Sequence, residues 1–203
     1  MSARPEAVVE KASLTPKDWE QAALELIAEK GIGGLAVEPL ARRLGITKGS
    51  FYWHFPGRNE LLEAALLRWE QQDQANLEKS FAISDQPLER LENFIWRTTQ
   101  QTLTHQIHLA MCAAREHELI RPVLQRVTNR RVAFLAKALT ELGFEKEAAS
   151  QRAMLLYSAY VGYLHLQSHH LVPEAGDPRF DDYVKHVINS LIQSIGEPDS
   201  APR

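Results

Sequence analysis

Residues 37–55 read VEPLARRLGITKGSFYWHF, and this stretch decides the fold. Its first part predicts a helix whose apolar face is formed by Leu40, Ala41 and Leu44. Gly45 follows at once, where a left-handed backbone conformation would end that helix. Thr47 is placed to cap a second helix by accepting an amide hydrogen bond. A helix, a glycine-bearing turn and a capped helix together predict a helix-turn-helix.

The second helix carries polar side chains suited to phosphates and base edges, namely Thr47, Lys48, Ser50, Tyr52 and His54. Gly49 lowers helix propensity by about 1 kcal/mol relative to alanine, which suggests close approach by another backbone. Residues 39–59 hold four basic side chains and no Asp or Glu, whereas the whole chain has a net charge of −3. This window is therefore the expected contact surface for a polyanion. The alternative is an ordinary helical hairpin with a solvated basic face.

The flanking residues extend this pattern. After TKGSFYWHF at residues 47–55 come a break at Pro56, the small Gly57 and the basic Arg58, which opens the next helix. With these features, Gly31 through Leu62 resembles the DNA-binding domain of the TetR family of bacterial transcriptional regulators. The resemblance covers roughly the first third of the chain.

The resemblance implies that helix 47–54 lies in the major groove of double-stranded operator DNA. The implied DNA-binding residues are Arg43, Thr47, Lys48, Gly49, Ser50, Tyr52, Trp53, His54 and Arg58. Arg58 would hold a phosphate at the start of the next helix, while Phe51 and Phe55 would belong to the core. Lys17 and Trp19 could reach the DNA backbone or serve as surface and packing residues. Ala36 and Gly57 replace hydroxyl residues common in the family, which would weaken phosphate contacts without disturbing the fold.

The patterning along the chain predicts an all-α protein, with a three-helix N-terminal domain and a larger helical bundle. The expected parts are a flexible arm at 1–13, a helix-turn-helix domain at 14–59, a connecting helix at 60–80, a ligand-binding and dimerisation domain at 81–195, and a disordered tail at 196–203. Within the larger domain we expect helices at 87–106, up to about 119, 122–142, 145–170 and 179–195. The first helix of the chain should start at Thr15 with Pro16 and Asp18 in its first turn.

Two of these helices carry more apolar surface than a single chain obviously needs: the segment 155–166, with Gly162 allowing close approach, and the last helix. The resemblance implies that they pair with their twofold mates in a homodimer; the alternative is that they form a monomer's core. The remaining helices could enclose a small-molecule effector, as the family typically does. Candidate lining residues, for which plain core packing is the alternative, are Phe94, Trp96, Thr99, Met111, Tyr157 and Tyr160.

Several histidines and the single cysteine invite a metal or redox hypothesis. His105 and His108 are spaced three apart with Cys112 one turn beyond, and a later cluster consists of His165, His169 and His170. The first pair straddles an expected helix junction and no carboxylate is fixed in register, so we expect neither a metal nor a cofactor. A sensing role for Cys112 would require activation by Arg115; a buried structural cysteine is the favoured interpretation.

Composition narrows the functional class further. No apolar run approaches the roughly 20 residues that span a bilayer, and the N-terminus lacks a hydrophobic segment, so we expect a cytoplasmic protein without membrane contact. No nucleophile–base pair, phosphate loop or paired carboxylates indicate an enzyme. The leading hypothesis is a repressor released from its operator by a small molecule bound in the bundle. An activator and a helical protein-interaction module are the alternatives.

Overall fold

The computed structural model describes residues 14–99, 101–174 and 176–192. Over these ranges the chain is helical, with no strand, which confirms the all-α prediction. The elements are α1 Pro16–Lys30, η1 (a 3-10 turn) Ile32–Gly34, α2 Val37–Arg43, α3 Lys48–Phe51, α4 Arg58–Phe81, α5 Pro87–Thr99, α6 Thr102–Ala113, α7 Ile120–Glu141, α8 Lys146–Ser168 and α9 Pro178–Ile192. The expected arm at 1–13 and tail at 196–203 lie outside the described residues.

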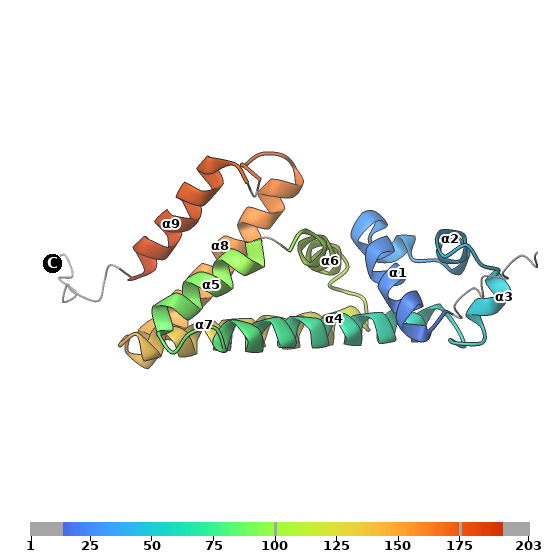
Figure 1. Cartoon of the computed structure of the whole chain (residues 1–203), viewed down its shortest axis with the longest axis horizontal. Helices are drawn as coiled ribbons and strands as arrows, with labels where there is room; N and C mark the ends of the chain where they lie inside the picture. The colour runs from blue at the N-terminus through green and yellow to red at the C-terminus, as the bar shows by residue number, and fades with distance from the viewer. Residues whose placement is uncertain (1–13, 100, 175, 193–203) are drawn as a thin grey trace, which may run out of the picture.

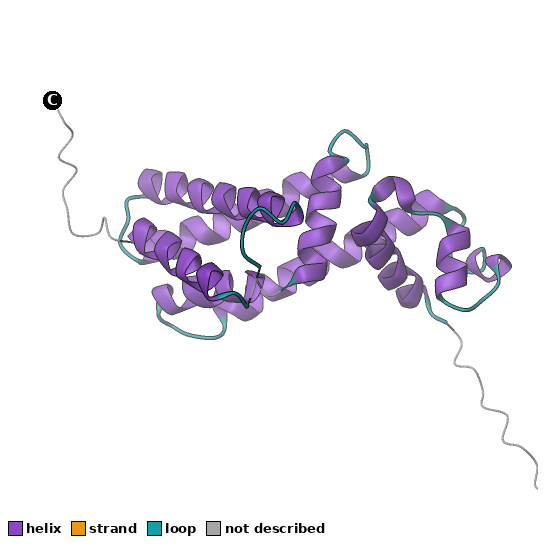
Figure 2. Ribbon diagram, turned by 90° about the horizontal axis from the view of Figure 1, so that it is seen from above, coloured by secondary structure: helices purple, strands orange, loops and turns teal. Residues whose placement is uncertain are grey.

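The molecule is elongated, with the small helices at one end and the bundle at the other (Figure 1). Helices α1 to α3 form the small end, and α5, α7, α8 and α9 form the bundle. The long helix α4 runs from the small end along the bundle, beside α7. Seen from above, α6 lies between the two ends (Figure 2). The connecting helix is thus shared by both parts of the molecule.

The first helix starts as the sequence predicts. The Asp18 carboxylate accepts hydrogen bonds from the backbone N–H and the hydroxyl of Thr15, both at 2.7 Å. The backbone hydrogen bond and then the hydroxyl contact hold the pKa of Asp18 below its ordinary value. Gly31 ends the helix in the left-handed region, with φ of 70°.

One hydrophobic core runs through the small end and continues into the bundle. It contains Trp19, Phe51 and Trp69, and it extends to Met111 of α6 and Val127 of α7, all nearly or fully buried. Helix α1 packs against α4 and α6 as well as against η1 and α2. The small end is therefore joined to the rest by α6 as well as by α4.

The helix expected over 87–106 ends earlier than the sequence indicated. Helix α5 ends at Thr99, Gln101 has a non-helical backbone, and α6 runs only to Ala113 instead of reaching residue 119. No glycine or proline marks the break in the sequence. The amide of Asn76 on α4 donates to the side-chain oxygen of Gln101 at 3.1 Å, a contact between segments far apart in the chain. Tertiary contacts, together with the low helix propensity of consecutive threonines, account for the break.

Candidate DNA-binding surface and bundle cavity

The turn between α2 and α3 has the geometry expected of a helix-turn-helix. Gly45 has φ of 68°, so only a glycine adopts this conformation without strain. The amide of Ile46 then donates to the carbonyl of Ala41 at 3.0 Å and fixes the corner. On the inner side, Phe51 is fully buried and meets Trp19 edge to face at 5.3 Å. Trp19 is thus a core residue and does not reach a DNA backbone.

The second helix differs in two details from the prediction. It is α-helical only from Lys48 to Phe51 and continues to His54 as single turns, with the amide of His54 donating to the carbonyl of Phe51 at 2.9 Å. Thr47 occupies the N-cap position but its hydroxyl makes no capping hydrogen bond. That hydroxyl is exposed and free to donate to an external acceptor.

The outer side of this element exposes large and polar side chains. Trp53 is 88% exposed and Tyr52 is 56% exposed, although both lie next to buried Phe51. Thr47, Lys48 and Gly49 are exposed as well, and Ser50 and His54 are half-buried. A Cβ added at Gly49 would meet no atom of the described residues closer than 3.9 Å, so packing within this part of the chain does not require a glycine here.

The two arginines of the predicted DNA surface already have partners within the chain. The Arg43 guanidinium donates to both carboxylate oxygens of Glu29 at 2.6 Å. Arg58 donates to the carbonyls of Leu35 and Ile32, each at 2.7 Å, and so holds the η1 turn against the start of α4. The sequence did not indicate this internal role, and the phosphate contacts of both arginines remain predictions.

With this geometry in place, the similarity to known proteins is specific. Residues 21–65 match the family model described as bacterial regulatory proteins, tetR family. The match spans α1, the helix-turn-helix and the start of α4. The chain carries the DNA-binding domain of the TetR family.

Curated relatives match over this TetR-family domain. The chain is 42% identical over 45 residues to the HTH-type transcriptional regulator SrpR of Pseudomonas putida, which is 22% of this chain and 21% of that protein. It is 49% identical over 53 residues to the class D tetracycline repressor protein of Escherichia coli, 26% of this chain and 24% of the repressor. The matches thus span less than a quarter of either relative.

Solved structures extend the likeness to the whole fold. A TetR transcriptional regulator from Legionella pneumophila superposes with a TM-score of 0.74 at 20% identity, covering 89% of this chain and 98% of that one. Reduced NemR from Escherichia coli superposes with a TM-score of 0.67 at 18% identity, covering 91% and 98%. At these identities the likeness establishes a shared fold beyond the TetR-family domain.

Behind the TetR-family domain, the bundle holds two small, partly open cavities of about 50 Å³ each. The first is lined by residues of α5, α6, α8 and α9, and the second by residues of α5, α7 and α8. Both share Ile95, Leu156 and Tyr160. His105 reaches the first cavity, while Thr98 and Arg131 reach the second.

The six predicted effector residues divide among different places. Phe94, Tyr157 and Tyr160 line the second cavity. Met111 is instead fully buried in the core beside α1, and Trp96 packs edge-on against Phe180 of α9. The side chain of Thr99 lies outside the described part of the structure. Sequence reasoning missed Arg131, although its four-residue spacing from Val127 and Leu135 puts it on the apolar stripe of α7.

A group of buried polar side chains surrounds Arg131, which is 3% exposed. Its Nε and Nη2 both donate to Oδ1 of Asp73 on α4, at 2.9 and 2.6 Å. Its guanidinium also lies 6.0 Å from the Trp69 ring and 5.8 Å from the Tyr160 ring. Burial is the main cause that raises the pKa of Tyr160 to about 12, opposed by the charge of Arg131.

The two histidines of α6 are neutral in this environment. Burial, with a smaller contribution from Arg131, lowers the pKa of His105 to about 4 and that of His108 to about 3. Nε2 of His108 lies 3.6 Å from the Cys112 sulfur. Burial raises the pKa of that thiol and outweighs Arg131 and Arg115, so the thiol is protonated at neutral pH. Among the described residues, no three His, Cys, Asp or Glu side chains gather as metal ligands.

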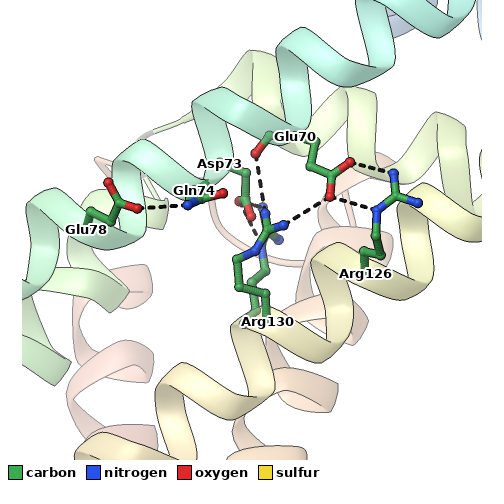
Figure 3. Close-up of polar contacts among 7 residues, drawn as sticks. Glu70, Asp73, Gln74, Glu78, Arg126 and Arg130 are labelled. Atoms are coloured by element: carbon green, nitrogen blue, oxygen red, sulfur yellow. Dashed lines mark hydrogen bonds and ion pairs between the residues drawn. The ribbon is translucent and has the colours of Figure 1, made fainter.

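Arginines of α7 tie this helix to α4, and Figure 3 shows Arg126 and Arg130 beside Glu70. Arg126 donates to both oxygens of Glu70 at 2.9 and 2.6 Å, and Arg130 donates to the same carboxylate at 3.0 Å. Arg131 and Asp73 form the buried pair one turn further along. The hydrogen bond from Arg126 is the main cause that holds the pKa of Glu70 below its ordinary value.

None of the described helices is long and apolar enough to span a membrane.

Proposed function

We propose that the protein is a transcriptional regulator that binds operator DNA in the cytoplasm as a homodimer and, as a repressor, leaves the DNA when a small molecule enters the bundle. The observation that carries the DNA-binding part is the outer side of α3 and the turns after it. There Lys48, Tyr52 and Trp53 project into solvent from an element whose other side is rigidly packed. An 88% exposed tryptophan leaves a large apolar surface in contact with water, and the groove of bound DNA would cover that surface.

Binding to the gene's own upstream DNA at two salt concentrations tests this proposal. Lys48→Ala should weaken binding and reduce the slope of log K against log salt by about 1, since one phosphate contact is lost. Tyr52→Ala should weaken binding with little change in slope. Lys146→Ala is the matched control, because Lys146 is an exposed lysine at the start of α8, at the far end of the molecule (Figure 1). If neither Lys48→Ala nor Tyr52→Ala weakens DNA binding more than Lys146→Ala does, the result favours the protein-interaction module.

The dimer proposal rests on an exposed stripe along α8. Leu155 is 62% exposed and Leu166 is 41% exposed, and between them Ser158 and Gly162 are exposed at helical spacing. A Cβ added at Gly162 would meet no atom within 4 Å. Leucines flanking small residues let a second helix approach closely, and a twofold axis beside α8 would bring two copies of the stripe together. Such a dimer also presents two recognition elements to two half-sites.

Two helices connect the cavities with the DNA-binding domain and support the effector part. Helix α6 places His105 at the first cavity and, two turns later, Met111 in the core against α1. Helix α4 is held to the bundle by Glu70 and Asp73 and begins at Arg58 in the DNA-binding domain. A ligand that favours one placement of these helices would favour one spacing of the two recognition elements.

A further inference from the structure

The polar side chains at the two cavities leave hydrogen-bonding capacity unused. Arg131 Nη1, Tyr160 Oη and His105 Nε2 have no partner of ordinary hydrogen-bond geometry among the described residues. Arg131 and His105 are 3% and 6% exposed, so bulk water does not serve them. The ring of Tyr160 lies 5.7 Å from that of His105 and 5.8 Å from the Arg131 guanidinium. Arg131 and Tyr160 both line the second cavity, and a buried unpaired donor is costly.

The remaining donor of Arg131 favours an anion. Arg126 and Arg130 share Glu70 and line neither cavity, whereas Arg131 lines the second cavity and pairs with Asp73. Asp73 occupies Nε and Nη2 of Arg131, so Nη1 can donate to a second acceptor without breaking this pair. Planar donors of a guanidinium match carboxylate oxygens well.

The rest of the lining is apolar and aromatic. Phe94, Leu135 and Tyr157 complete the wall of the second cavity, and Ile95 and Leu156 belong to both. Each cavity measures about 50 Å³, whereas a cavity that holds a benzene ring measures about 150 Å³. A ring-sized ligand must therefore widen the space between α5, α7 and α8, and this movement would couple its binding to the shape of the bundle.

From these contacts we propose that the second cavity binds a small aromatic carboxylic acid, with Arg131 receiving the carboxylate and Tyr160 donating to it. The ring would lie among Phe94, Leu156 and Tyr157. That this acid is the effector rests on the function proposed above, whereas its binding does not.

Calorimetry on the full chain without DNA tests the site with defined probes. These are benzoate, phenylacetate and 3-phenylpropionate, each beside its uncharged amide. The acid should bind about tenfold or more tightly than its amide in at least one pair, since a hydrogen bond to a charged group is worth more than a neutral one. Tyr160→Phe removes only a hydroxyl and should weaken the acid about tenfold while leaving the amide nearly unchanged. Tyr163→Phe is the matched control, because Tyr163 lines the first cavity and its hydroxyl already donates to the Pro173 carbonyl at 2.5 Å.

Three acids that bind no better than their amides would overturn the proposal and leave the cavities to water. It would equally fail if Tyr160→Phe lost no more affinity than Tyr163→Phe, with both variants shown folded by circular dichroism. Selective acid binding that leaves DNA affinity unchanged would support the site and contradict only the regulatory proposal. If the protein binds operator DNA but none of the acids, the proposed acid site is contradicted and the DNA-binding proposal is supported.

Discussion

The buried pair of Asp73 and Arg131 should be the most costly polar contact in the protein to break from one side. Both side chains are nearly inaccessible, at 7% and 3% exposure, and Oδ1 of Asp73 receives two N–H groups of Arg131. Asp73→Ala leaves a guanidinium buried without a counter-charge. Breaking a buried pair in this way costs about 3–5 kcal/mol, a large part of the roughly 5–15 kcal/mol that stabilises a domain.

A neighbouring pair supplies the contrast. Arg126 is 52% exposed, and its partner Glu70 keeps a second hydrogen bond from Arg130. Arg126→Ala should therefore cost only about 0–1 kcal/mol. The double variant Asp73→Leu with Arg131→Met replaces both charges with apolar groups and should regain most of the loss, because the desolvation of both ions is then avoided.

Urea unfolding followed by circular dichroism, at one protein concentration, measures all four proteins. The concentration is held fixed because dimer formation would add to the apparent stability. The m-value should be unchanged, so that midpoints report stability alone. If Asp73→Ala costs no more than Arg126→Ala, or if the double variant is as unstable as the single one, the pair does not hold α4 to α7 as argued.

Three further outcomes follow from single features. Gly45→Ala should destabilise the domain by about 1–2 kcal/mol because φ at this position is 68°, while Gly33→Ala, at an exposed glycine without positive φ, should cost less in the same unfolding assay. The contribution of His105 and His108 to the free energy of unfolding should be fully present above about pH 6.5 and fall as the pH drops toward 4, because their folded pKa values are lowered to about 4 and about 3. Urea midpoints that stay level between about pH 6.5 and 4 would contradict the burial of neutral histidines. Leu155→Glu should shift the sedimentation of a dimer to that of a monomer without altering the helical content, and a monomeric wild type would remove the α8 interface.

Local chemistry sufficed for much of the first third of the chain. Gly45, the Thr15–Asp18 helix start and the aromatic run after Lys48 each depend on backbone conformation or on neighbours in sequence, and each stands where the sequence placed it. Phe51 and Phe55, which the resemblance placed in the core, are buried as well. What this stretch left open was the use of Arg58, whose carbonyl partners lie 23 and 26 residues away.

The bundle was decided by tertiary structure. The end of α5 before residue 100, the place of Met111 in the core beside α1 and the pairing of Arg131 with Asp73, 58 residues away, all depend on which helices lie side by side. Amphipathic spacing shows that a helix has a buried face but not which neighbour covers it. The four-residue spacing from Val127 and Leu135 puts Arg131 on the buried stripe of α7. Only the packed helices show that Asp73 is its partner and that a cavity lies beside it, because both depend on which helices meet in the folded chain.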